Sequence, residues 1–178
     1  AANQAGASRI IYVSSAIVFG PTDGRTADET WPCALGPYFL EYQRTKVLGE
    51  IEAERLAAAG LPVLIALPLL FFGPQADFAR STYNKVLNRL ILDFWRDRLL
   101  GPSGVEHRWI NAAHIDDVVA GLCLTAERGM VGERYLLTGE NVTVQGFLEA
   151  LSAVSGIRRR SRFRPFGLVR AAAAIQEC

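Results

Sequence analysis

The sequence predicts an α/β fold built on a parallel sheet, with a more irregular second half. Two observations carry this prediction. A strand, a helix and a second strand follow one another within the first 73 residues, and both strands are mainly continuous apolar runs. Strands buried in a parallel sheet have this composition, and a helix is the usual connection between two of them. The chain has 178 residues, half of them apolar, which is enough for a substantial core.

The first half supplies the elements of a βαβ unit. The first strand is predicted over residues 9–15 (RIIYVSS), where β-branched and aromatic residues gather. Residues 20–37 are dense in Gly, Pro, Asp and Thr, which predicts a long surface loop. A helix is predicted over residues 41–59, since apolar residues recur near helical spacing and a Gly and a Pro follow. The second strand is predicted over residues 61–73 (LPVLIALPLLFFG).

The second half mixes helices and short strands. Helical periodicity predicts helices from about Ala79 to Leu99, from Asn111 to Arg128, and over residues 143–156 with Thr143 as the N-cap. Short strands are predicted at residues 107–111 and 134–139.

Composition narrows the function classes. A formal net charge of +1 gives no global electrostatic case for binding nucleic acid or a membrane surface. The arginine cluster at residues 158–165 could bind phosphate groups, but we favour an exposed connecting segment. The apolar run at 61–72 is too short to cross a membrane. Three cysteines without a Cys-x-x-Cys pair favour neither a disulfide framework nor a zinc site, which fits a cytoplasmic protein.

One pair of side chains points to chemistry. Tyr42 and Lys46 are four residues apart on a predicted helix, and Lys46 is one of only two lysines. Residues at i and i+4 share a helix face, and an ammonium group near a phenol favours the phenolate, which brings a tyrosine closer to proton transfer at neutral pH. Ser14 and Ser15 end the first strand, at the sheet edge where ligands bind. The alternative is a surface helix with a packed tyrosine and a solvated lysine.

The segments around these residues resemble the extended short-chain dehydrogenase/reductase superfamily (NAD-dependent epimerase/dehydratase family), in its dihydroflavonol-4-reductase-like branch. In that superfamily a strand ending in Ser-Ser precedes Tyr-x-x-x-Lys and a later strand ends in a Gly-Pro turn, as IIYVSSAIVFGPTDG, EYQRTK and LPLLFFGP do here. The stretches INAAHIDDVVAGL and GERYLLTGENVT are similar to a helix entry and to a strand and turn of the same family. The resemblance runs from about Ala7 to Gly156.

The resemblance implies roles for five residues. Ser15 would polarise the substrate oxygen, Tyr42 would donate or accept the proton, and Lys46 would lower the pKa of the tyrosine while binding the nicotinamide ribose. The backbone around Pro68, Leu69 and Leu70 would pass near the nicotinamide. Together with Tyr42 and Lys46, these three residues are the expected cofactor contacts.

The resemblance also implies an architecture. We expect a partial Rossmann-like parallel sheet, corresponding to the C-terminal half of that fold, with a small α+β substrate lobe. Residues 1–75 would belong to the Rossmann-like part and residues 76–178 mostly to the lobe, with 108–126 returning to the Rossmann-like part. The family's Gly-x-x-Gly-x-x-Gly fingerprint does not occur in the sequence. We therefore expect a fragment without the dinucleotide-binding half, or a degenerate product, and the choice between NAD and NADP is not readable.

The expected function is that of an NAD(P)-dependent oxidoreductase that transfers hydride to or from a carbonyl or alcohol, with a tyrosine as proton donor or acceptor. The alternatives are a nucleotide-sugar epimerase or dehydratase with the same triad, and a non-catalytic fragment or binding protein. We expect a small-molecule substrate and neither a nucleic-acid nor a membrane partner, with a homodimer as one possible assembly. No metal site is expected, because the resemblance favours a helix N-terminus for Asp116 and Asp117 and a structural role for His114.

Overall fold

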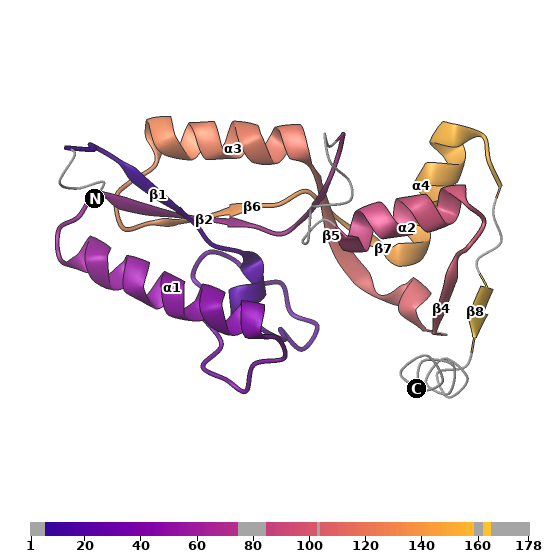
Figure 1. Ribbon diagram of the computed structural model, residues 1–178, viewed down its shortest axis with the longest axis horizontal. Coiled ribbons are helices and arrows are strands. Elements are labelled where there is room, and N and C mark those ends of the chain that lie inside the picture. Colours follow the sequence, from indigo (N-terminus) through magenta and orange to yellow (C-terminus); the bar gives the residue numbers. More distant parts are fainter. Residues whose placement is uncertain (1–5, 75–84, 103, 159–161, 165–178) are drawn as a thin grey trace. The chain divides into compact units, whose positions relative to one another are not determined.

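The computed structural model describes four stretches of the chain, residues 6–74, 85–102, 104–158 and 162–164. The chain divides into two compact units (Figure 1). Unit 1 contains the described residues of Ala1–Phe71 and Ala113–Gly139, and unit 2 contains those of Phe72–Ala112 and Glu140–Cys178. Which unit binds a substrate stays a prediction.

Unit 1 is a parallel sheet covered by a helix on each face. Its strands are β1 (Ile10–Val13), β2 (Val63–Pro68) and β6 (Arg134–Leu137), in the order β1-β2-β6, and both pairings are parallel. Helix α1 (Glu41–Ala58) covers one face and α3 (Ile115–Arg128) covers the other (Figure 1). The α/β class and the predicted βαβ unit, β1-α1-β2, are therefore confirmed.

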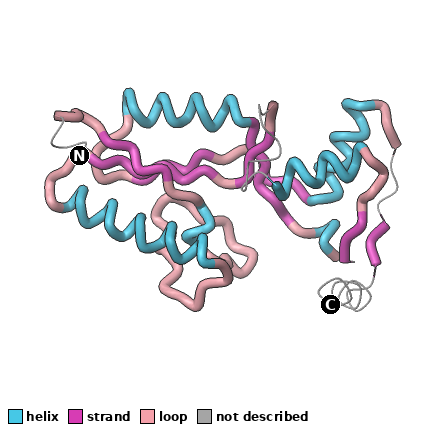
Figure 2. Tube along the Cα trace, viewed as in Figure 1, coloured by secondary structure: helices cyan, strands magenta, loops and turns pink. Residues whose placement is uncertain are grey.

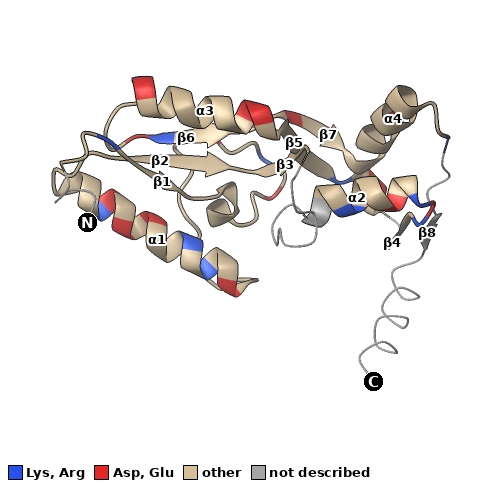
Figure 3. Ribbon diagram, turned by 45° about the horizontal axis from the view of Figure 1, so that its top comes forward, with Lys and Arg blue, Asp and Glu red and all other residues tan. Residues whose placement is uncertain are grey.

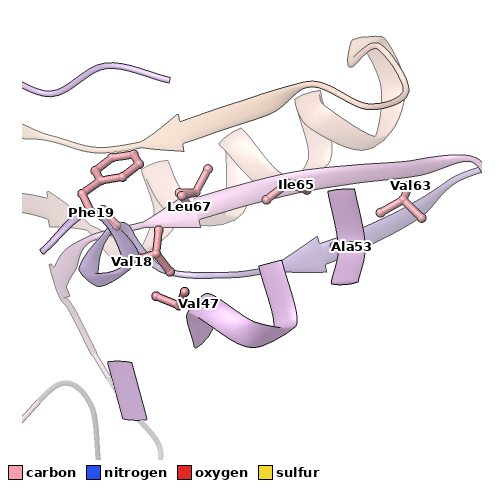
Figure 4. Packing of buried hydrophobic residues seen from close by; sticks show 8 residues of the cluster. Val18, Phe19, Val47, Ala53, Val63, Ile65 and Leu67 are labelled. Atoms are coloured by element: carbon pink, nitrogen blue, oxygen red, sulfur yellow. The ribbon is translucent and has the colours of Figure 1, made fainter. Parts of the chain in front are cut away.

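The core of unit 1 lies between α1 and the sheet. All six residues of β2 are buried, because this strand has a neighbour on each side and a helix on each face. The buried residues of α1 recur at helical spacing along one face: Gln43, Val47, Glu50 and Ala53. Figure 4 shows Val47 beside Val18 of the short 3₁₀ helix η1 (Ala16–Phe19) and Ala53 beside β2.

Strand β1 is shorter and less buried than predicted. It covers four residues of the expected 9–15, and Val13 is 42% exposed. The reason is its position, since within the described sheet it pairs only with β2. The backbone of Ser14 still donates to Ala66 O at 2.8 Å, after which Ser15 caps η1 and the chain leaves the sheet.

The predicted strand 61–73 is two strands. β2 ends at Pro68, which is also its last residue in register with β6, and β3 (Leu70–Phe72) belongs to a second sheet with the order β3-β5-β7. Apolar composition could not reveal this break, because residues on both sides of it are equally apolar. A proline lacks the N–H that would continue a strand ladder, which fits its place at the strand end.

Unit 2 contains shorter elements. They are α2 (Lys85–Trp95), β4 (Leu100–Pro102), η2 (Val105–His107), most of β5 (Trp109–His114), β7 (Glu140–Thr143), α4 (Val144–Ser155) and β8 (Arg162–Arg164). β5 and β7 pair antiparallel and β4 and β8 pair parallel. A small core is formed by Phe94, Leu99, Val144 and Leu148. The predicted α4 is confirmed, and Thr143 Oγ1 caps it by accepting from Gly146 N at 3.0 Å.

Two predicted helices were too long. The first four residues of the predicted helix 111–128 belong to β5, because His114 is the N-cap of α3 and its Nδ1 accepts from Asp116 N at 3.3 Å. Within the predicted helix 79–99, residues 79–84 lie outside the described residues, and α2 ends at Trp95, just before Asp97 adopts a positive φ of 55°. Strand β7 was not predicted, because its sequence is polar and its hydrogen-bonding partner is distant along the chain.

The long loop before α1 contains no helix or strand (Figure 2). It is not entirely a surface loop, since Trp31 and Cys33 pack against the core of unit 1. No helix in the described stretches is long and apolar enough to cross a membrane.

Candidate active site

Lys46 lies between Tyr42 and the end of β1. Its Nζ is 5.7 Å from the centroid of the Tyr42 ring and donates to Val13 O at 2.9 Å. It is also 5.8 Å from the ring centroid of Tyr12. The helix places Tyr42 and Lys46 one turn apart, and the bond to Val13 directs the ammonium group towards the strand end two residues before Ser15.

Lys46 differs from four other charged residues of α1, which are exposed and pair with each other along the helix. Figure 3 shows that both acidic and basic residues occur along this helix. Arg44 pairs with Glu41 at 3.2 Å and Arg55 pairs with Glu52 at 2.6 Å, and all four side chains are largely exposed. Ion pairs of this kind contribute little to stability because water and salt screen them. Lys46 is instead partly buried and bonded to another element.

Ser14 and Ser15 have different environments. Ser14 is 2% exposed, and its hydroxyl donates to Glu50 Oε2. Ser15 is partly buried, and its Oγ accepts from Ile17 N at 3.4 Å, as the N-cap of η1. In this bond the Ser15 hydroxyl acts only as an acceptor, so its hydrogen can be donated elsewhere. The choice of Ser15 over Ser14 as a site residue fits these environments, although its role stays a prediction.

The expected cofactor contacts Pro68, Leu69 and Leu70 lie at and just after the end of the neighbouring strand β2. Val13 is in register with Ala66, so the end of β1 lies beside the end of β2, where Pro68 is buried. Leu69 is partly buried against the core, and Leu70 begins β3. Pro68 therefore shares the carboxyl edge of the parallel sheet with the end of β1, an edge where ligands bind in open α/β sheets.

Beneath this edge lies a buried ion pair that the sequence analysis missed. Glu50 is fully buried, and Arg134 of β6 donates from Nη2 to Glu50 Oε1 at 2.7 Å. The same carboxylate accepts from Ser14 and, at 3.5 Å, from Cys33 Sγ. The burial of Glu50 could have been predicted from its spacing. It lies three residues after the buried Val47 and four after Lys46, so it shares the inner face of the helix with them. Its partner is 84 residues away and could not be read from the pattern.

The buried pair affects the neighbouring thiol. Burial raises the pKa of Cys33 to about 12, the Glu50 carboxylate adds to this shift, and Arg134 opposes it. Cys33 is therefore a neutral thiol near neutral pH. Burial also raises the pKa of Tyr12, again with a contribution from Glu50, so that this phenol stays protonated.

The carboxylates near His114 serve the start of α3. Asp116 and Asp117 lie in its first turn, where negative charge complements the helix dipole, and Asp116 Oδ2 is 3.4 Å from His114 Nδ1. No group of three or more His, Cys, Asp or Glu side chains that could hold a metal ion occurs among the residues described.

Two curated relatives match nearly the whole chain. "Sterol demethylase protein B" of Methylococcus capsulatus (strain Bath) is 30% identical over 178 residues, covering 99% of this chain and 51% of the relative. A Synechocystis protein (strain PCC 6803) that carries the provisional name dihydroflavonol 4-reductase is 30% identical over 181 residues, covering 99% and 50%. The chain thus spans about half the length of the curated relatives it matches.

A solved structure has the same fold. The nucleoside-diphosphate-sugar epimerase PA4631 of Pseudomonas aeruginosa superimposes with a TM-score of 0.75 at 25% identity, over 99% of this chain and 56% of that one. The Rossmann-like architecture expected from the sequence is therefore confirmed. The model of the NAD dependent epimerase/dehydratase family matches residues 1–137, more than three quarters of the sequence, and the chain belongs to that family.

Proposed function

We propose that this chain carries the proton-transfer residues of an NAD(P)-dependent oxidoreductase of the dihydroflavonol-reductase-like kind. The substrate would be a small molecule whose carbonyl is reduced to an alcohol, or the reverse. The observation that carries the proposal is the position of Lys46, which is 5.7 Å from the Tyr42 ring centroid and hydrogen-bonded to the end of β1. The similarity to a protein named as a dihydroflavonol 4-reductase supports a reductase.

Tyr42 is the proposed acid in the reductive direction and the base in the oxidative one. A phenol ordinarily holds its proton too tightly for rapid transfer near neutral pH, and a nearby ammonium favours the phenolate. Lys46 provides that positive charge. Because its Nζ has three donors and gives one to Val13 O among the described contacts, two remain for ligand hydroxyl groups.

Ser15 is the proposed group that holds the substrate oxygen. It follows a strand whose last residue, Val13, is in register with Ala66 of β2, and its hydroxyl can donate while its Oγ accepts from Ile17 N. A hydroxyl donor directed at a carbonyl oxygen stabilises the negative charge that develops there during hydride addition. Hydrogen bonds from Ser15 and Tyr42 to one oxygen would orient the carbonyl as well as polarise it.

The residues present fit one end of the cofactor. The Lys46 ammonium and the Tyr42 phenol suit the hydroxyls of a nicotinamide ribose, and the backbone from Pro68 to Leu70 would flank the ring. When bound, the nicotinamide supplies or accepts the hydride. The sequence lacks the glycine fingerprint that lets a backbone approach the pyrophosphate. NAD and NADP remain equal candidates.

The test is Tyr42→Phe in the complete product of the gene, assayed with NADH and NADPH against a panel of ketones and aldehydes. Loss of the proton donor should lower kcat about 100-fold to 10,000-fold, while the Kd of the cofactor changes little. Tyr38→Phe is the matched control, since it removes a hydroxyl from another partly buried tyrosine near the helix start. Wild-type turnover in Tyr42→Phe would refute the proposed role.

A second candidate is a nucleotide-sugar epimerase or dehydratase with the same three residues, favoured by the similarity to PA4631. Such an enzyme oxidises its substrate transiently and restores the cofactor, so product would form without a net change in nicotinamide absorbance. A stoichiometric absorbance change would support the reductase. Absence of both turnover and cofactor binding in the complete gene product would favour the third hypothesis, a non-catalytic fragment or binding protein. A cytoplasmic location and a homodimer are further expectations that stay predictions.

A further inference from the structure

The buried ion pair between Glu50 and Arg134 is not explained by stability alone. Moving two charges out of water is costly, and replacement of such a pair by apolar residues is often neutral or stabilising. Here the pair is also incompletely satisfied, since Arg134 Nε is buried without a hydrogen-bond partner in the part of the chain that the structure describes. Because stability does not account for the Glu50–Arg134 pair, its role should be found in other residues whose positions depend on it.

Glu50 joins the two elements that carry the proposed catalytic residues. It belongs to α1, one turn after Lys46 and two turns after Tyr42, and its Oε2 accepts from the hydroxyl of Ser14. Ser14 directly precedes Ser15. A second bond between the same elements runs from Lys46 to Val13 O, so the segment from Val13 to Ser15 is tied to α1 at two successive residues.

Arg134 holds the carboxylate in this position. Its Nη2 bonds to Glu50 Oε1, while its Nη1 donates to Trp31 O at 2.7 Å and to Glu29 O at 3.1 Å. The guanidinium also lies 5.1 Å from the ring centroid of Phe19. Because Oε1 is occupied by Arg134, Oε2 is directed to Ser14, and the carboxylate has little freedom to rotate away.

We propose that Glu50 is a positioning residue that acts through Ser14 to fix the hydroxyl of Ser15 for catalysis. This inference rests on the proposed function of Ser15. The Ser14 hydroxyl is not a site group in its own right, since it is 2% exposed and donates to Glu50. Its contribution is to hold the backbone at the strand end, and a displacement of about 1 Å in a positioned group can lower turnover by about 100-fold.

The test is a double-mutant cycle between Ser14→Ala and Ser15→Ala in the complete gene product. Ser14→Ala should lower kcat by about 10-fold to 100-fold with little change in KM or in cofactor Kd, because it disturbs a group used mainly in the transition state. In the Ser15→Ala background, the same change should cost less than about twofold, because the group that it positions is already absent. Independent structural effects would instead multiply.

Two controls separate positioning from loss of stability. Thr125→Val removes another buried hydroxyl, one that donates to Gly121 O at 2.8 Å in α3, and kcat should be unchanged. Glu50→Gln keeps an oxygen acceptor for Ser14 and should retain kcat within about 10-fold of wild type. Glu50→Leu combined with Arg134→Met removes the acceptor without leaving Arg134 as an unpaired buried charge, and this double variant should resemble Ser14→Ala. The Glu50→Leu, Arg134→Met double variant also keeps the proposal testable if Ser14→Ala does not fold, because it removes both buried charges together.

The outcomes are distinct. If Ser15→Ala lowers kcat but Ser14→Ala and the Glu50→Leu, Arg134→Met double variant do not, the positioning role is refuted while the proposed function stands. If the losses in the Ser14→Ala, Ser15→Ala double variant multiply, Glu50 and Ser14 act on stability or on another group, and the proposal is also refuted. If Ser15→Ala leaves turnover unchanged, both the proposed role of Ser15 and the inference built on it fail.

Discussion

Removal of one partner from the buried ion pair should destabilise unit 1 strongly. We consider Arg134→Met, which keeps an unbranched apolar stem in the core but leaves the Glu50 carboxylate without its cation. Glu50 is 0% exposed and the Arg134 side chain is 13% exposed, so water can replace little of the lost interaction. Leaving one member of such a pair unpaired typically costs about 3–5 kcal/mol. A loss of this size is a large part of the stability of a small domain.

The assay is equilibrium unfolding in urea followed by tryptophan fluorescence, with the free energy of unfolding extrapolated to water. Glu50→Leu combined with Arg134→Met should recover most of the loss, ending within about 2 kcal/mol of wild type, because both desolvated charges are removed together. The matched control is Arg55→Met. Arg55 pairs with Glu52 at 2.6 Å, a similar distance, but both side chains are more than half exposed, so little change is expected.

The comparison of Arg134→Met with Arg55→Met shows whether the loss of stability depends on the burial of the ion pair or only on the distance between its charges. If Arg134→Met costs no more than Arg55→Met, the pair does not behave as a desolvated ion pair, and the argument from burial is refuted. If the double variant is as unstable as the single one, the lost stability comes from packing or from the loop carbonyls that Arg134 contacts. Added salt should weaken the exposed pair and leave the buried one nearly unchanged.

Four further outcomes test the local structure. Gly49→Ala should cost about 1–3 kcal/mol in urea unfolding, because the added Cβ would overlap the Tyr12 hydroxyl and lie 3.0 Å from its Cζ, and Tyr12→Phe should relieve part of this cost. Thr143→Ala should cost about 1 kcal/mol by removing the cap of α4, a loss that a fully stable variant would contradict. At pH 8 a thiol reagent should modify exposed Cys123 much faster than partly buried Cys33, whose pKa burial raises to about 12, and equal rates in peptide mapping would contradict this difference between the two thiols. The same raised pKa predicts that the contribution of Cys33 to stability is present below about pH 9 and is lost as the pH rises towards 12.

Local pattern was sufficient where the interaction was local. Helix α1 begins at the predicted Glu41 and ends one residue early, and Thr143 caps α4 as expected, because helical spacing and caps depend on residues a few positions apart. The pairing of Tyr42 with Lys46 was predictable for the same reason, since one helical turn separates them. The family was also recognisable, because its motifs lie in contiguous segments.

The tertiary structure decided what depends on distant partners. Only the sheet order shows that β1 has one strand neighbour within the described residues, that the apolar run 61–73 divides at Pro68 between two sheets, and that polar β7 is a strand at all. Likewise, Glu50 could have been read as a solvated helix residue until Arg134 was brought against it from β6. The spacing of residues along one element specifies which side chains share a face, whereas burial and charge pairing depend on which other elements that face meets.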